Sequence, residues 1–355
     1  MLCWKGESKM STKRDRVLGA FLGCAIGDAM GAPTETRPIE LIKRDVGDGD
    51  YVRDFKTPRP DTLPAGMPAG MVTDDFSVSY LTALFSMQEE GKITTQACKD
   101  ALVEWVKYDR YFLAHSGKTS KEAIARLTGG TVLGKPDHSH DYCYMNNDSA
   151  SNGAGMKAWV AGVFNPGNVM GAIKDAITMI KVSHDNPVAL SAGCAVAAAT
   201  AVAMAQGSIS DVVDAALFGA EYGYKHTWYT CSKFSTGANV AKRIRMAVSI
   251  GINYAHDFDA LIKNMTDIVG TGINANEAIP AAIGFFVAAQ GKVMDGVYMA
   301  VNAGNDSDTV AAIVGALCGA YSGTEGVPAE YLKFLTDVND LEIEKVADRV
   351  SALSD

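Results

Sequence analysis

Small residues recur at every fourth position in parts of the chain, and this pattern predicts helices that pack closely. Glycines occupy positions 19, 23, 27 and 31 of an otherwise apolar segment. Side chains four residues apart lie near one face of an α-helix. Because an interior glycine costs a helix about 1 kcal/mol relative to alanine, this stripe indicates that a second backbone approaches that face. Alanine and glycine repeat the spacing within 189–205 and 311–319.

Apolar positions with a helical period predict eight further helices, and no convincing run alternates as a strand would. Pro280 falls in the first turn of its predicted helix, where proline is tolerated. We therefore expect an all-α fold, a compact orthogonal bundle of many helices. The eight predicted helices span residues 76–90, 95–108, 167–182, 209–222, 237–250, 257–268, 276–289 and 293–301.

The apolar stretch 187–206 is about as long as a bilayer requires. Alanine, serine, threonine, glycine and cysteine dominate it, so its transfer into lipid would be only weakly favourable. We interpret this stretch as a buried helix rather than a membrane span.

The chain shows neither an internal repeat nor a linker, so residues 13–355 are expected to form a single domain. Residues 1–12 lack the apolar run of a signal peptide and are expected to be a flexible N-terminal extension. Two long irregular stretches, 45–71 and 128–152, interrupt the helical pattern. Long loops inside a domain are often functional.

Composition narrows the class of protein. Hydrophobic residues make up 48% of the chain and the mean hydropathy is +0.03, which excludes a disordered polymer and a multi-span membrane protein. The net charge of −9, with mixed signs, argues against a sequence-independent nucleic-acid binder. Seven scattered cysteines fit neither a disulfide framework nor a zinc ribbon, so we expect reduced thiols in a cytoplasmic protein. A monomer is the default expectation.

Acidic residues gather at three places where a predicted helix begins or ends. Helix capping would explain one aspartate per helix, because negative charge suits a helix N-terminus, but adjacent carboxylates repel each other. Carboxylate and hydroxyl oxygens together fit a site for Mg²⁺, Mn²⁺ or Ca²⁺, and an Asp-x-Asp pair could serve two adjacent ions. The three clusters are Glu35; Thr73, Asp74 and Asp75; and Asp306, Asp308 and Thr309.

Four motifs, taken in their order along the chain, resemble the ADP-ribosylglycohydrolase family. They are GCAIGDAMGAPTE at 23–35, TDD at 73–75, SNGAGMKA at 151–158 and NAGNDSDTVA at 302–311. The resemblance implies an all-α hydrolase with two Mg²⁺ or Mn²⁺ ions that cleaves the bond between C1″ of ADP-ribose and an acceptor. The implied acceptor is a protein side chain such as arginine or a related small molecule, and the charge of −9 disfavours a nucleic-acid acceptor.

The resemblance also implies a role for each matching residue. Glu35, Asp75 and Asp308 are the implied catalytic residues, since Glu35 or an aspartate of the metal site would orient or deprotonate the attacking water. Asp308 is placed to bridge the two ions, and His184 resembles the family's histidine near the distal ribose. The implied metal ligands are Thr73, Asp74, Asp75, Asp306, Asp308 and Thr309. The implied substrate-binding residues are Glu35, His184 and a diphosphate-binding loop of Ser151, Asn152, Gly153, Ala154, Gly155 and Met156.

Some residues depart from the family pattern or lie outside it. Phe76 stands where the family often has threonine or serine, and Lys157 stands where arginine is common. His138 and His140 look like a metal clip, but we favour a solvated loop. The aromatic stretch 222–229 is interpreted as core rather than as a wall of the ligand pocket.

Two other functions fit the same residues. The first is a two-metal phosphohydrolase or deacylase that acts on ADP-ribose derivatives such as O-acetyl-ADP-ribose. The second is a non-catalytic relative, as in the lens crystallins of this family. The products of the reaction would separate these alternatives from a glycohydrolase.

Overall fold

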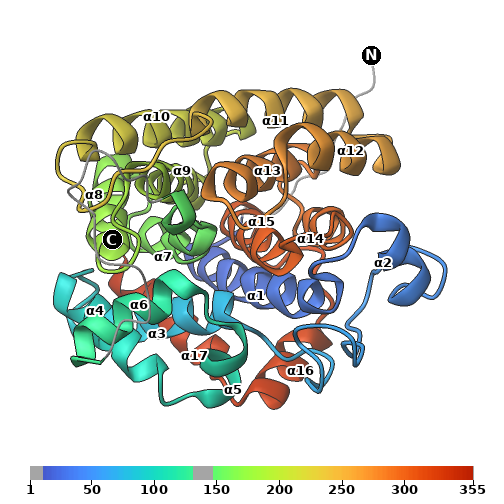
Figure 1. Ribbon diagram of the computed structural model, residues 1–355, viewed down its shortest axis with the longest axis horizontal. Helices are drawn as coiled ribbons and strands as arrows, with labels where there is room; N and C mark the ends of the chain where they lie inside the picture. The colour runs from blue at the N-terminus through green and yellow to red at the C-terminus, as the bar shows by residue number, and fades with distance from the viewer. Residues whose placement is uncertain (1–10, 131–146, 355) are drawn as a thin grey trace.

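Helices α1 (Lys13–Gly31) and α15 (Ser307–Ser322) lie side by side at the centre of the molecule with their backbones in contact (Figure 1). A β-carbon on Gly23 would lie 2.1 Å from the carbonyl oxygen of Gly315, and one on Gly315 would lie 2.0 Å from the carbonyl oxygen of Gly23. Neither position has room for a larger residue. The close approach predicted from the glycine stripe is confirmed.

The computed structural model describes residues 11–130 and 147–354, which contain helices and no strand. The predicted all-α fold is therefore confirmed. Helices α10 and α11 lie on one side of the α1–α15 pair, and α3 to α6 lie on the other side with α16 and α17 (Figure 1). The remaining α-helices are α2 (Ile39–Asp45), α3 (Asp74–Gln88), α4 (Thr95–Trp105), α5 (Asp109–His115), α6 (Lys118–Thr128), α7 (Gly155–Phe164), α8 (Val169–Lys181), α9 (Pro187–Met204), α10 (Ile209–Thr227), α11 (Val240–Tyr254), α12 (Phe258–Asn264), α13 (Ala275–Ala288), α14 (Val293–Val301), α16 (Glu330–Asn339) and α17 (Ile343–Leu353). Short helical turns are η1 (Ala32–Thr34), η2 (Asn147–Ser149), η3 (Asn152–Ala154) and the π-helical η4 (Met265–Val269).

A second seam of small residues surrounds α9, which α7, α8 and α10 contact. A β-carbon on Gly162 of α7 would lie 2.6 Å from the carbonyl oxygen of Ala197. One on Gly219 of α10 would lie 2.3 Å from the carbonyl oxygen of Cys194. The alanine-rich sequence of α9 is therefore explained by helices that approach it from several sides.

Each of the eight helices predicted from periodicity overlaps an observed helix, and 293–301 coincides with α14. Helices α2, α5, α6, α7, α16 and α17 lie outside the predicted ranges. These six have 7 to 11 residues, so each offers only two or three turns of apolar pattern. Helices this short take most of their stability from tertiary packing.

The position predicted for Pro280 is wrong. Helix α13 begins at Ala275, so Pro280 lies in its second turn rather than its first. Because proline has no backbone N–H, the helix cannot supply the usual partner for the carbonyl of Asn276. Arg243 of α11 donates to that carbonyl instead, at 2.9 Å.

Two helical segments are long and apolar enough to cross a membrane, Lys13–Thr34 and Pro187–Met204. Their most apolar windows are 100% and 94% buried inside the protein. The interpretation of 187–206 as a buried helix is confirmed, and α1 is a second helix of the same kind.

The interpretation of 222–229 as core is wrong. Tyr229 is 92% exposed, and no aromatic side chain of this stretch is buried. Tyr222 stacks on His226 along α10 with ring centroids 3.7 Å apart. The period of α10 turns its small residues, not its aromatic ones, toward α9. His138, His140 and residues 1–10 lie outside the described residues.

We predict that Gly23→Ala destabilises the protein by about 2 kcal/mol, because overpacking a rigid backbone contact outweighs the gain in helix propensity. The midpoint of thermal unfolding measures this effect. Gly130→Ala is the matched control, since a β-carbon there meets atoms no closer than 3.6 Å. Equal midpoints for the two variants would contradict the account of the α1–α15 seam.

Candidate active site

Asp28 of α1 is a fully buried carboxylate that holds the start of α3. It accepts hydrogen bonds from the Thr73 hydroxyl at 2.7 Å, from the Thr73 N–H at 3.0 Å and from the Phe76 N–H at 2.9 Å. Thr73 occupies the N-cap position of α3, yet its own side chain does not cap that helix. Asp28 was not predicted from the sequence, although a lone carboxylate in a glycine-striped apolar helix is a signal that could have identified it.

Asp28, Asp75 and Asp308 bring together three carboxylates from α1, α3 and α15. One oxygen from each lies within 4.8 Å of the other two. The Thr309 hydroxyl donates to Oδ2 of Asp75 at 3.1 Å. Oδ1 of Asp75 is buried and has no hydrogen-bond partner, so this group has an oxygen available for a cation.

Glu35, Asp306 and Asp308 form a second group with the same spacing, and Asp308 belongs to both. Asp306 occupies the N-cap position of α15, but its side chain does not cap the helix. It accepts a hydrogen bond from the side-chain amide of Asn152 at 2.7 Å instead. Helix capping by these side chains therefore does not explain the acidic clusters.

A pair of backbone hydrogen bonds places Glu35 beside Asp306. The N–H of Thr36 donates to the carbonyl of Asn305 at 2.6 Å, and the N–H of Asn305 donates to the carbonyl of Arg37 at 3.4 Å. Thr36 and Asn305 have φ values of 63° and 56°, in the left-handed region. Such conformations are strained for residues other than glycine and occur preferentially at functional sites.

Burial raises the pKa values of Asp28, Glu35, Asp74, Asp75 and Asp308, and repulsion from neighbouring carboxylates raises those of all but Asp28 further. Burial is the larger cause, and it brings the pKa of Asp28 and of Glu35 to about 7. The pKa values of Asp74, Asp75 and Asp308 are raised well above the usual range for the same reasons. None of the ion pairs in the described residues includes these side chains or Asp306. Divalent cations would relieve this repulsion, so the residues present fit a metal site.

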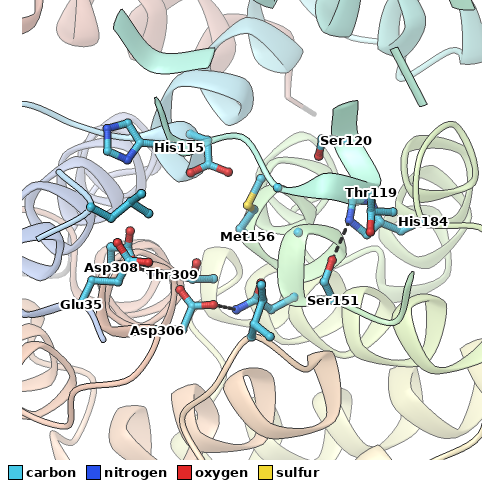
Figure 2. A pocket seen from close by; sticks show the side chains of 16 residues that line it. Glu35, His115, Thr119, Ser120, Ser151, Met156, His184, Asp306, Asp308 and Thr309 are labelled. Carbon is cyan, nitrogen blue, oxygen red and sulfur yellow. Dashed lines mark hydrogen bonds between the residues drawn. The ribbon is translucent and has the colours of Figure 1, made fainter. Parts of the chain in front are cut away.

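Glu35, Asp306 and Asp308 line one end of a pocket, and Ser151 and His184 lie at its other end (Figure 2). Asp28 and Asp75 are buried behind this end and do not line the pocket. Asn152, Gly153 and Met156 also line the pocket. The predicted diphosphate loop is in fact the turn η3 followed by the start of α7. Ala154 and Gly155 are buried and do not line the pocket, because this turn directs them toward neighbouring helices.

Six pocket residues were not predicted from the sequence: Leu63, His115, Gly117, Thr119, Ser120 and Ile273. Nε2 of His115 is buried without a partner, and burial, reinforced by Lys121, lowers the pKa of His115 to about 4. The His115 ring is therefore neutral at pH 7. No motif surrounds these residues, so the sequence offered no signal for them, and the long segment 45–71 contributes Leu63.

The two ends of the pocket offer opposite electrostatics. The carboxylate end attracts cations. The other end offers hydroxyl groups and the N-terminus of α7, which favour an anion. The site therefore suits a ligand with a hydroxyl-rich, metal-binding part joined to an anionic part.

The comparisons with known proteins agree with this geometry. Residues 9–355 match the family model described as ADP-ribosylglycohydrolase. The chain is 27% identical to the uncharacterized protein YegU of Escherichia coli, over 94% of this chain and 96% of that protein. It is 25% identical to the ADP-ribosylarginine hydrolase Tri1 of Pseudomonas putida, over 90% of this chain and 74% of that protein. A solved structure titled ADP-ribosylglycohydrolase-related protein complex shares the fold, with a TM-score of 0.66 and 24% identity, over 97% of this chain and 99% of that one.

We predict that the metal-free protein loses thermal stability as the pH rises from 4 through 7. A carboxyl group whose pKa is higher in the folded state binds more protons there than in the unfolded state, so deprotonation destabilises the fold. Mn²⁺ replaces those protons, so it should raise the unfolding midpoint more at pH 8 than at pH 5. Thermal unfolding with and without Mn²⁺ measures both effects.

Asp308→Asn is the informative variant here, because Asp308 belongs to both acidic groups. It should reduce both the stabilisation by Mn²⁺ and the loss of stability at high pH. A metal-free protein that gains stability from pH 4 to 7 would contradict this account.

Proposed function

The chain belongs to the ADP-ribosylglycohydrolase family, and from this premise we propose that it hydrolyses the bond between C1″ of ADP-ribose and an acceptor, using two Mg²⁺ or Mn²⁺ ions. One observation carries the proposal. Two groups of carboxylates share Asp308, and Asp308 lines one end of a pocket whose other end suits an anion. ADP-ribose has this bipolar form, with a ribose diol at one end of a diphosphate.

The two acidic groups would each hold one ion, with Asp308 between them. Asp75 would offer its unpartnered Oδ1 to one ion, and Glu35 and Asp306 would help to hold the other. Thr73, Asp74 and Thr309 adjoin these groups and complete the proposed ligand set. When bound, the ions polarise water and the ribose hydroxyls.

Glu35 suits the role of the group that orients and deprotonates the attacking water. Its carboxylate lines the pocket beside Asp306 and Asp308, where it can accept a hydrogen bond from a water and then take its proton. The water oxygen bonds to C1″ while the bond from C1″ to the acceptor breaks, and the proton passes to the acceptor. The positive charge that develops on the ribose is stabilised by the surrounding carboxylates.

The end of the pocket opposite the carboxylates, which favours an anion, would hold the diphosphate. Ser151 and Gly153 lie at the start of η3 and α7, and Thr119 and Ser120 lie near the start of α6. Helix N-termini and hydroxyl groups are suitable donors to phosphate oxygens. His184, which bonds to Ser151, would position this end of the substrate.

An ADP-ribosylated protein side chain is the proposed substrate, with arginine first among the acceptors. The similarity to Tri1 supports this choice.

We predict that Glu35→Gln lowers kcat by 10² or more with little change in KM, and that Asp308→Ala abolishes turnover. The assay follows release of free ADP-ribose from a panel of ADP-ribosylated arginine, serine and O-acetyl substrates in the presence of Mg²⁺ or Mn²⁺. Glu330→Gln, an exposed carboxylate change on α16, is the matched control.

The products decide between the functions. Free ADP-ribose together with an intact acceptor supports the proposal. Release of AMP or of an acyl group would favour the phosphohydrolase or deacylase, and binding of ADP-ribose without turnover would favour a crystallin-like protein. Turnover that survives full chelation of divalent ions would overturn the proposed mechanism.

A further inference from the structure

Lys157 of α7 is a buried lysine that the proposed reaction does not use. Its side chain is almost fully buried, at 2% exposure, and it forms no ion pair with a carboxylate among the described residues. Burial lowers the pKa of Lys157 to about 8. Keeping an ammonium group in such a place is unfavourable unless hydrogen bonds compensate.

A chain of hydrogen bonds links Lys157 to the pocket. Its Nζ donates to Oγ of Ser183 at 2.8 Å, and Ser183 Oγ lies 2.8 Å from Nδ1 of His184. Nε2 of His184 lies 3.1 Å from Oγ of Ser151 (Figure 2). The His184 ring is held closely, because a β-carbon on Gly153 would lie 2.7 Å from its Nε2.

The direction of each hydrogen bond in this series follows from Lys157, the donor at which it starts. An ammonium group can only donate, so Ser183 accepts from Lys157 and its own O–H is left for Nδ1 of His184. Burial holds the pKa of His184 well below its usual range, so the ring is neutral. Because Nδ1 accepts the Ser183 O–H, the single ring proton is on Nε2. Nε2 then donates to Ser151, and the Ser151 O–H remains free to donate into the pocket.

We propose that Lys157 is a positioning residue which, through Ser183 and His184, makes the hydroxyl of Ser151 a hydrogen-bond donor to a phosphate oxygen of the substrate. The identity of that anion rests on the proposed function. If the chain of bonds ran the other way, Ser151 would donate to His184 and would present only lone pairs to the phosphate. Lys157 thus determines whether the Ser151 hydroxyl donates or accepts, although it does not contact Ser151.

A double-mutant cycle on the dissociation constant of ADP-ribose, measured by calorimetry with Mn²⁺ present, tests the proposal. Ser151→Ala, Lys157→Met and Ser183→Ala should each weaken binding on the order of tenfold, the usual cost of losing a hydrogen bond to a charged group. In the Ser151→Ala background, the other two changes should have no further effect. Ser191→Ala is the matched control, because its hydroxyl donates to the Ala220 carbonyl between α9 and α10.

The pH dependence of binding gives a readout that a purely structural lysine would not affect. Above pH 8 a neutral Lys157 can accept from Ser183 and reverse the chain, so wild-type binding should weaken several-fold by pH 9. Lys157→Arg, which stays protonated, should bind tightly and remain insensitive to pH. Cys98 of α4 faces Lys157 and Lys233 acts on His184, but burial raises the Cys98 pKa to about 11, so that thiol does not titrate in this range.

The outcomes separate the two proposals. Wild-type protein that does not bind ADP-ribose overturns the proposed function and this inference together. Two outcomes would overturn this inference alone. In the first, the wild-type protein binds ADP-ribose and neither Lys157→Met nor Ser183→Ala weakens that binding. In the second, either change weakens binding further in the Ser151→Ala background. Thermal unfolding of every variant identifies a loss of fold, and Ser183→Ala keeps the test valid if Lys157→Met does not fold.

Discussion

The distance between the backbones of α1 and α15 sets the geometry of the acidic site. A β-carbon on Gly31 would lie 2.4 Å from the Cα atom of Asp308, so the last turn of α1 contacts the first turn of α15 directly. Asp28 lies one turn earlier on α1, which places it beside Asp308 and beside the start of α3. A single methyl group in this seam would push apart the helices that carry the carboxylates. The glycine stripe is therefore a requirement of the site as well as of the packing.

The carboxylates at this seam are unfavourable for the metal-free fold. They are buried, they repel each other, and the backbone at Thr36 and Asn305 is strained. The fold tolerates these costs because the surrounding helices bury a large apolar core. Unfavourable groups that persist inside a well-packed protein are typical of functional sites, where a ligand restores the balance.

The two ends of the pocket are connected through a few polar side chains. Asn152 donates to Asp306, and its neighbour Ser151 bonds to His184. The backbone of Asn152 also bonds to the carbonyl of Ile273, which fixes the start of η3 against the loop before α13. Because rigid hydrogen bonds hold both ends, the spacing between the cation-binding and anion-binding groups is largely set before a substrate arrives.

The sequence by itself determined most of the helices and the chemical types of many site residues. Helical periodicity is a local property, so α9 and α14 could be predicted from the chain alone. The glycine stripe predicted a close contact between helices but not which helix would make it. The motifs indicated Glu35, Asp75 and Asp308, because carboxylates where helices begin or end are visible in the sequence.

Only the tertiary structure decided which groups meet. The partnership of Asp28 with Thr73, the presence of His115 in the pocket and the link from Lys157 to Ser151 each join residues from different elements. Local patterns cannot specify such pairs, since the packing of whole helices determines them. The same reason explains the errors, because the surroundings of Pro280 and of Tyr222 depend on the helices that pack beside them.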